Sequence, residues 1–226
     1  MPTGEFLTSP CPRLEAMHVF RDRAAQRPFE GTSMKTLKKA NVTQLTDQLW
    51  IGGELDRQDH ELAVAQLDEL SKAGINAIID CRIEWDDLDW APDAQPRMDF
   101  LSIGVEDAGF FMPDEWFDDG VSYALDQISQ GRVVLAHCQA GINRGPSMGF
   151  LILVAQGWDA IDALNLIRKR RPIARIAYAE QAIDWWLERT GPSEDEVLVQ
   201  IRRIKKWRLD TKVTRLSEPD GTWMGV

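Results

Sequence analysis

Hydrophobic and polar residues follow two different periods along the chain, and the shorter period marks the strands. Apolar runs at 75–79, 98–105 and 132–136 are short and rich in β-branched residues, which is typical of buried strands. The stretch 42–51, which ends at two glycines, predicts an edge strand or a hairpin. The run R-V-V-L-A at 132–136 has the clearest pattern of a central strand.

The longer period marks the helices. Three leucines set among charged residues predict an amphipathic helix over 58–72, which ends near Gly74. A second helix, over 113–130, begins at a proline and stops before Gly131. Four further helices are predicted over residues 147–156, 158–170, 177–189 and 194–208.

Strands that alternate with helices predict an α/β fold. We expect a central, mainly parallel sheet of about five strands, flanked by helices on both faces. Residues 1–40 contain four prolines and no sustained periodicity, so they form a partly disordered N-terminal extension with a short helix around 15–26. Residues 41–190 form the body. Residues 191–226 form a C-terminal amphipathic helix, which packs on the body or binds a partner, and a flexible tail.

Composition and charge narrow the class of protein. The net charge of -10 argues against a broad basic face for nucleic acid, although it leaves room for a small basic pocket. Three widely spaced cysteines and three histidines suit neither a disulfide framework nor a zinc site, so we expect no metal and no other cofactor. There is no signal-peptide pattern, and the longest apolar stretch, 148–155, is too short to span a membrane. We expect a soluble protein in the reducing cytoplasm, with no membrane partner.

The segment H-C-Q-A-G-I-N-R-G-P-S, at 137–147, lies between the central strand and a helix and carries the candidate chemistry. The residues after Cys138 can curl so that their N–H groups form an anion nest, to which the helix adds its positive end. Arg144 returns over the same space, and its planar fork can hold two phosphate oxygens. In that field the Cys138 thiol ionises readily and becomes a nucleophile. The predicted phosphate-binding residues are Gln139, Ala140, Gly141, Ile142, Asn143 and Arg144.

This H-C-x5-R loop resembles that of the protein tyrosine phosphatase superfamily, in its dual-specificity branch. The resemblance runs from about residue 42 to residue 186. The segments at 49–55 (L-W-I-G-G-E-L) and 74–84 look like the first two strands of that branch, and R-K-R-R-P-I at 168–173 looks like part of its helical C-terminal half. The resemblance implies a two-step reaction through a cysteinyl-phosphate, without a metal.

The resemblance also implies roles outside the loop. Members carry a general acid on a mobile loop about thirty residues before the cysteine, which protonates the leaving group. Asp107 lies 31 residues before Cys138 and is the candidate acid, with Glu106 and Asp114 as alternatives. A lone histidine at a strand end is usually a core residue, but His137 precedes the nucleophile, and the resemblance implies that it orients the loop and favours the thiolate. We favour this supporting role over direct proton transfer.

The loop departs from the family pattern at one position. Most members have serine or threonine directly after the loop arginine, where its hydroxyl assists hydrolysis of the phosphoenzyme. This chain has Gly145 there, and its next hydroxyl is on Ser147, beyond Pro146. Either Ser147 substitutes from a different angle, or the second step is slow. Our hypothesis is a slow second step.

The sequence therefore predicts that 41–190 is the catalytic domain of a cysteine-dependent phosphatase. We expect it to hydrolyse phosphate monoesters, chiefly phosphotyrosine in a phosphorylated protein, with phosphoserine and phosphothreonine as further substrates. One alternative is a polynucleotide (RNA) 5′-phosphatase, because such relatives often carry asparagine where this chain has Asn143. Another is a catalytically impaired phosphate-binding module, which the glycine at 145 suggests.

Overall fold

The computed structural model describes residues 34–85, 98–109, 111–191 and 193–211. The helix expected around 15–26, most of the N-terminal extension and the C-terminal tail lie outside the described residues. In the part of the chain that is described, no helix has both the length and the apolar character to cross a membrane.

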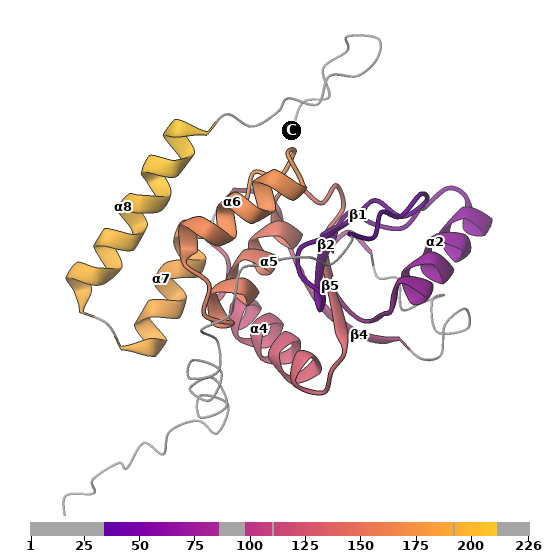
Figure 1. Cartoon of the computed structure of the whole chain (residues 1–226), viewed down its shortest axis with the longest axis horizontal. Helices are drawn as coiled ribbons and strands as arrows, with labels where there is room; N and C mark the ends of the chain where they lie inside the picture. The colour runs from indigo at the N-terminus through magenta and orange to yellow at the C-terminus, as the bar shows by residue number, and fades with distance from the viewer. Residues whose placement is uncertain (1–33, 86–97, 110, 192, 212–226) are drawn as a thin grey trace, which may run out of the picture.

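A five-stranded sheet forms the centre of the structure, in the order β1-β2-β5-β3-β4 (Figure 1). The first two strands pair antiparallel as a hairpin, and the other neighbours pair parallel. The predicted mainly parallel sheet is thus confirmed, with the R-V-V-L-A strand in the middle. The strands are β1 (Val42–Gln44), β2 (Leu49–Gly52), β3 (Ile75–Arg82), β4 (Asp99–Val105) and β5 (Val133–His137).

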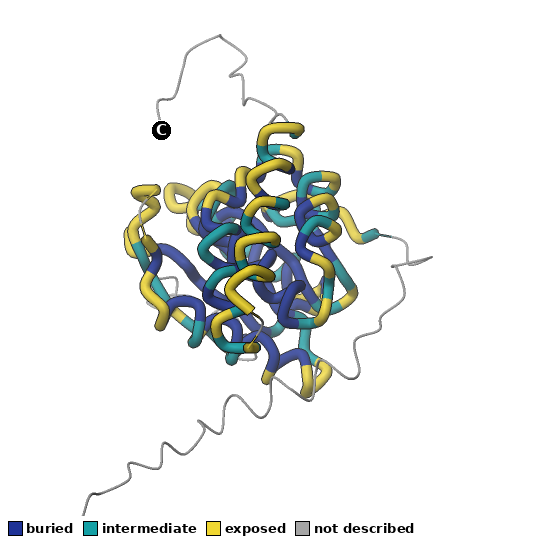
Figure 2. Tube along the Cα trace, turned by 90° about the vertical axis from the view of Figure 1, so that its left-hand side faces the viewer, coloured by how far each residue is buried: buried dark blue, intermediate teal, exposed yellow. Residues whose placement is uncertain are grey.

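Helices cover both faces of this sheet, as predicted. One helix, α2, packs its leucines on one face, while α4 and α5 pack on the other and the last three helices lie outside α5. Buried residues gather between these layers, and exposed ones follow the outer helix surfaces (Figure 2). The helices are α2 (His60–Ala73), α4 (Asp114–Ser129), α5 (Arg144–Ala155), α6 (Ala160–Arg170), α7 (Ala179–Thr190) and α8 (Glu194–Asp210).

Helix α5 begins earlier than the sequence predicts. We expected a helix over 147–156, after the Gly145-Pro146 pair, but the helix already includes Arg144. A proline is tolerated in a first turn because the N–H that it lacks has no intrahelical acceptor there. The prediction was right about burial, since every residue of α5 is buried. The early start places the positive end of α5 directly at the candidate loop.

Strand β3 is longer than predicted. The apolar pattern ended at residue 79, but the strand continues to Arg82 and includes two buried charged residues. Arg82 Nη2 lies 2.6 Å from Asp80 Oδ2, so the two charges neutralise each other inside the sheet. Cys81 lies between them. Burial, then the nearby charges of Cys138 and Asp80, raise the pKa of the Cys81 thiol well above its ordinary value, which makes it a poor nucleophile.

Candidate active site

The candidate loop leaves the carboxyl end of β5 and enters α5. Cys138 is the first residue after the strand, and its N–H donates to the Gly52 carbonyl at 3.2 Å. Cys138 and Arg144 are each 2% exposed. The central position of β5 therefore places the predicted nucleophile at the carboxyl edge of the sheet, where ligand sites of parallel sheets form.

A second arginine, Arg171, lies behind the loop. Its Nε donates to the Gly141 carbonyl at 2.6 Å, and its Nη2 donates to the Ala140 carbonyl at 3.0 Å. The same Nη2 donates to Asn41 Oδ1 at 3.0 Å, which connects the loop to the residue before β1. Burial lowers the pKa of Arg171, and the negative charge of Cys138 opposes that shift. Arg171 is therefore a buried support of the loop.

Backbone groups hold the rest of the loop. The Gln139 carbonyl accepts a hydrogen bond from Glu54 N at 3.0 Å. The Ile142 carbonyl accepts two, from the N–H groups of Arg175 and Ile176, at 2.9 and 3.3 Å. The Asn143 carbonyl accepts from the Ser147 N–H at 2.8 Å, inside α5. Together with the two carbonyls on Arg171, every carbonyl from residue 139 to residue 143 is bound from outside that segment.

The orientation of these carbonyls fixes the N–H groups. In a trans peptide the C=O of one residue and the N–H of the next point in opposite directions. The N–H groups of residues 140–144 therefore point away from the groups that hold the carbonyls, toward the concave side of the loop. Within the described residues, no acceptor receives a hydrogen bond from the N–H groups of 139–144, and no side chain caps α5. This arrangement is an anion nest at a helix N-terminus.

Gly141 is needed for this shape. Its φ of +66 lies in the left-handed region, which disfavours other residues. A Cβ added there would lie 2.4 Å from Arg171 Nη2 and 2.5 Å from the Gly52 carbonyl carbon. Both the backbone conformation and the close approach of Arg171 therefore require glycine at this position.

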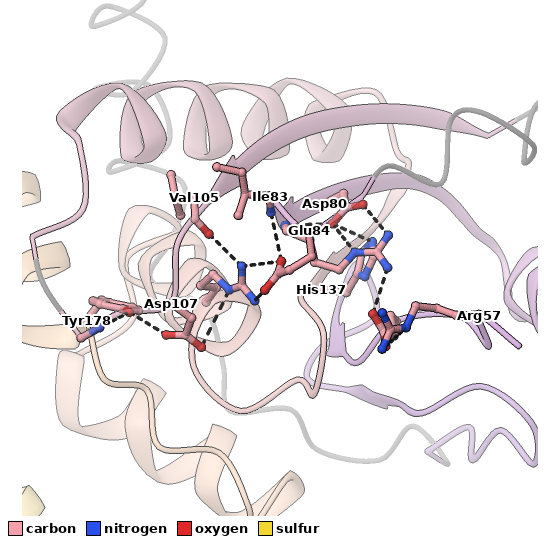
Figure 3. Close-up of polar contacts among 12 residues, drawn as sticks. Arg57, Asp80, Ile83, Glu84, Val105, Asp107, His137 and Tyr178 are labelled. Atoms are coloured by element: carbon pink, nitrogen blue, oxygen red, sulfur yellow. Dashed lines mark hydrogen bonds and ion pairs between the residues drawn. The ribbon is translucent and has the colours of Figure 1, made fainter. Parts of the chain in front are cut away.

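Arg144 makes three hydrogen bonds to two groups on neighbouring elements. Its Nη1 and Nη2 donate to the Glu84 carboxylate at 2.9 and 2.8 Å, and its Nη1 also donates to the Val105 carbonyl at 2.7 Å (Figure 3). Burial alone lowers the pKa of Arg144, but the Glu84 hydrogen bond and the negative charges around it outweigh that effect and raise the pKa. Among the described residues, Nε has no hydrogen-bond acceptor. That N–H is available to an oxyanion.

The candidate acid, Asp107, faces Arg144. Asp107 Oδ2 lies 3.8 Å from Arg144 Nε, and Oδ1 accepts a hydrogen bond from the Tyr178 hydroxyl at 2.6 Å (Figure 3). The hydroxyl in turn accepts from Gly109 N at 3.2 Å. Burial, then the hydrogen bond to Asp107, raise the pKa of Tyr178 to about 12, so it remains a hydrogen-bond donor at neutral pH.

The alternative acids lie elsewhere. Glu106 is exposed, and Asp114 is paired with Arg189 at 3.3 Å, at the start of α4. Farther along the acid loop, Met112 N donates to Gln181 Oε1 at 2.9 Å and its carbonyl accepts from Gln181 Nε2 at 2.6 Å. Helix α7 therefore holds this loop at two places, through Tyr178 at its N-cap and Gln181 in its first turns.

His137 lies against the buried charges of β3. Its Nε2 is 3.7 Å from Asp80 Oδ1, and the sheet register pairs these two residues directly. Arg82 contacts Asp80 and also Glu54 Oε2 at 3.2 Å. His137 is buried and lies in this network, and its supporting role stays a prediction.

The glycine after the loop arginine has a structural reason. A Cβ on Gly145 would lie 2.9 Å from His137 Cα and 3.0 Å from the Ala136 carbonyl oxygen, and neither is a side-chain atom that can move aside. Ser147 is fully buried, and its Oγ accepts a hydrogen bond from Tyr178 N at 3.2 Å. No hydrogen bond joins Ser147 to Cys138 in the described residues. The close contact between α5 and β5 thus leaves no room at residue 145 for the serine or threonine that most family members have there.

Sequence reasoning missed three residues of the site: Arg171, Glu84 and Tyr178. Arg171 was one of four consecutive basic residues, and only the following Pro172 hinted that it leaves the helix. Glu84 was part of an acidic stretch, whose remainder (86–90) lies outside the described residues. Tyr178 is one of two tyrosines in the chain, and nothing in its local sequence distinguishes it.

The site as a whole combines a buried thiol, inward N–H groups, an arginine and a neighbouring carboxylate. Groups of this kind can neutralise the charge of a phosphate monoester next to a thiol, so the combination is typical of a cysteine-dependent phosphatase. In the described ranges, no group of three or more His, Cys, Asp or Glu side chains is placed to hold a metal ion.

Comparison with known proteins agrees with this class. A sequence model of the dual specificity phosphatase catalytic domain matches residues 60–185. The match covers more than half of the chain, and the chain belongs to this family. No curated protein sequence matches it.

Several solved structures share the fold. A mouse putative dual specificity phosphatase complexed with zinc tungstate is similar with a TM-score of 0.56 and 18% identity, over 71% of this chain and 96% of that one. PTPMT1 in complex with PI(5)P gives a TM-score of 0.55 and 18% identity, over 66% and 97%. Human DUSP28 gives 0.51 and 14%, over 74% and 97%. At these identities the likeness establishes the fold alone.

Proposed function

We propose that this protein hydrolyses phosphate monoesters through a cysteinyl-phosphate on Cys138, with phosphotyrosine in proteins as the main substrate and phosphoserine or phosphothreonine as further substrates. The observation that carries the proposal is the set of five bound carbonyls from 139 to 143, because it turns the intervening N–H groups toward the concave side of the loop that begins at Cys138. A thiol nucleophile needs a reducing compartment, so we propose that the protein acts in the cytoplasm.

In the first step the Cys138 thiolate attacks phosphorus in line with the leaving oxygen. The S–P bond forms as the P–O bond breaks, and the N–H groups of 140–144 together with Arg144 Nε–H stabilise the equatorial oxygens. Asp107 donates its proton to the leaving oxygen, so that an alcohol or phenol departs rather than its anion. Tyr178 holds Asp107 at the edge of the site.

In the second step water attacks the phosphorus of the cysteinyl-phosphate. Asp107, now a carboxylate, takes a proton from that water, the P–S bond breaks, and phosphate leaves with the thiolate restored. No hydroxyl follows the loop arginine to stabilise the departing thiolate, because Gly145 is there. We propose that this step limits turnover. With an activated aryl phosphate, the phenol product should then appear in an initial burst whose concentration equals that of the enzyme. A linear time course at saturating substrate would contradict the slow second step.

Three substrates test the proposal: an aryl phosphate, a phosphotyrosine peptide, and RNA with a 5′-triphosphate. We expect turnover of the first two, loss of both in Cys138→Ser, and little release from the RNA. A phosphoinositide extends the panel, because one structural neighbour was solved with PI(5)P. Preference for the RNA would favour the polynucleotide phosphatase that Asn143 suggested. Oxyanion binding without turnover of any substrate would favour the impaired phosphate-binding module.

The assignment of the acid has its own test. Asp107→Asn removes the proton donor, so hydrolysis of an alkyl phosphate is expected to fall by about 100-fold or more, as typical for loss of a general acid. An aryl phosphate with an activated leaving group needs no proton and is expected to lose far less. Glu106→Gln serves as the control, because Glu106 is the adjacent carboxylate and, among the described residues, contacts neither Arg144 nor Tyr178 as Asp107 does. Equal losses on both substrates would exclude Asp107 as the acid.

A further inference from the structure

Helix α8 lies outside the part of the chain that defines the family. The family match ends at residue 185, and α8 begins at Glu194 behind a complete capping box on Ser193. It packs on the outer side of α6 and α7, away from the sheet (Figure 1). Much of its surface is exposed, including Leu198 and Val199.

The last two turns of α8 anchor it. Ile204 and Trp207 are buried in the main core. Trp207 Nε1 donates to Asn165 Oδ1 at 2.8 Å, and the Arg168 guanidinium lies 4.8 Å from the centre of the Trp207 ring. These contacts place the next residue, Arg208, close to the segment that connects α6 to α7.

Arg208 binds both the start of α7 and that connecting segment. Its Nε and Nη2 donate to the Glu180 carboxylate at 2.5 and 2.6 Å, a bidentate pair that fixes the plane of the guanidinium. Its Nη1 donates to the Arg175 carbonyl at 2.9 Å, and its Nη2 donates to the Ile176 carbonyl. One side chain of α8 therefore holds two successive carbonyls.

The two residues whose carbonyls Arg208 binds, Arg175 and Ile176, also bind the phosphate-binding loop. The N–H groups of Arg175 and Ile176 donate to the Ile142 carbonyl, and their C=O groups accept from Arg208. Ile176 has a φ of +54, the left-handed conformation that a β-branched residue rarely adopts. Such a conformation persists only where surrounding contacts enforce it. Ile176 is the single described non-glycine residue with positive φ.

We propose that α8 is a brace for the phosphate-binding loop, with Arg208 as a positioning residue that acts through the 175–176 turn. By holding that turn in its strained conformation, Arg208 keeps the Ile142 carbonyl bound, and the peptide geometry then keeps the Asn143 N–H pointing into the nest. The inference rests on the proposed function of the loop, and it adds a contribution from an element beyond the family's domain.

The test compares two arginines of the same helix in the full chain. Arg208→Ala removes the brace. Arg203→Ala is the matched control, because Arg203 also ties α8 to the body, at 2.9 Å from Asp159 Oδ2, but contacts neither the turn nor the loop. The readouts are tungstate affinity by calorimetry, the pH dependence of Cys138 alkylation by iodoacetamide, and Tm. None of the three needs turnover.

We expect Arg208→Ala to weaken tungstate binding by about tenfold, the effect of losing one charge-assisted contact in such a site, and to move alkylation of Cys138 to higher pH. Arg203→Ala is expected to match the wild type in both, at a similar Tm. Arg208→Lys keeps the charge but not the fork, so we expect an intermediate affinity, which keeps the test decisive if the alanine variant fails to fold.

Two results would overturn the brace. If the wild type binds tungstate and hydrolyses an aryl phosphate, while the Arg208 variants match Arg203→Ala in affinity and alkylation, then α8 does not position the loop and the proposed function stands. If the wild type neither binds tungstate nor turns over an aryl phosphate, the proposed function fails and the brace fails with it.

Discussion

The two sides of the phosphate-binding loop are held in different ways. Behind the loop, the supports are largely buried: Arg171, Ile176 and the packing of Gly145 against β5. In front of it, the contacts are made by partly exposed carboxylates, Glu84 and Asp107, on loops after β3 and β4. A buried polar group that loses its hydrogen-bond partner lowers the stability of the fold, whereas an exposed ion pair contributes little to that stability. We infer that the back fixes the shape of the nest and that the front can change as substrate enters.

The largest effect is expected from the back, in Arg171→Met. The change keeps much of the apolar side chain and leaves the carbonyls of Ala140 and Gly141 and the Asn41 amide oxygen without a buried donor. At about 1–3 kcal/mol for each unpaired buried group, the free energy of unfolding should fall by about 3 kcal/mol or more. Urea denaturation measures it. Lys169→Met, at an exposed position of α6, is the control; equal losses in the two variants would remove the special role of Arg171.

Gly145→Ser also alters the back. It introduces the hydroxyl that the family usually has, but its Cβ meets the backbone of Ala136 and His137. Overpacking of this kind should lower the free energy of unfolding by about 1–3 kcal/mol. We expect the burst of an aryl phosphate to remain, because the strand and helix must separate to accept the side chain. A variant that is as stable as the wild type and shows no burst would disprove this steric explanation.

Tyr178→Phe alters the front. It removes the hydrogen bond that holds Asp107 and leaves the ring in place, so stability should fall by about 1 kcal/mol, as for a single hydrogen bond. Hydrolysis of an alkyl phosphate should fall by about threefold to tenfold, because the acid is less well placed. Tyr123→Phe is the control on the second tyrosine, which lies in α4. A larger effect on activated aryl substrates than on alkyl ones would contradict this role.

The smallest effect is expected at Glu84. The hydrogen bonds from Arg144, the largest stabilising cause, lower its pKa below the ordinary 4.5 despite partial burial. A carboxylate with a lowered folded-state pKa stabilises the protein above its unfolded pKa, and this contribution is lost as pH falls through the folded value. Glu84→Gln should therefore lower stability by about 1 kcal/mol or less near neutral pH and by nothing in strong acid. Thermal unfolding at several pH values tests this; a difference that grows in acid would contradict it.

Much of the architecture could be predicted from the sequence because it depends on local patterns. The apolar run 132–136 and the H-C-x5-R motif at 137–144 together indicated where the central strand ends and the nest begins. The leucine pattern of α2 and its terminal glycine were equally local signals. These features need no knowledge of what packs against them.

The remaining features depend on groups far apart in the chain. Arg171 binds Asn41, which lies 130 residues away, and Glu84 binds Arg144 across 60 residues. No propensity distinguishes such a residue from a solvated charge, so four consecutive basic residues looked alike. The positive φ of Ile176 was equally hidden, because its own side chain argues against that conformation. Tertiary contacts alone enforce it.

The five bound carbonyls have a consequence for how activity arises during folding. Four of the five are bound by distant donors, from Glu54, ahead of the motif, and from Arg171 and the 175–176 turn, well after it. Contacts between residues so far apart in sequence form only after the segments around residue 54 and residues 171–176 have packed against the motif. A nascent chain that exposes Cys138 before residue 176 is synthesised therefore has an incomplete anion nest. In refolding experiments, oxyanion binding should appear with the final phase rather than with early helix formation.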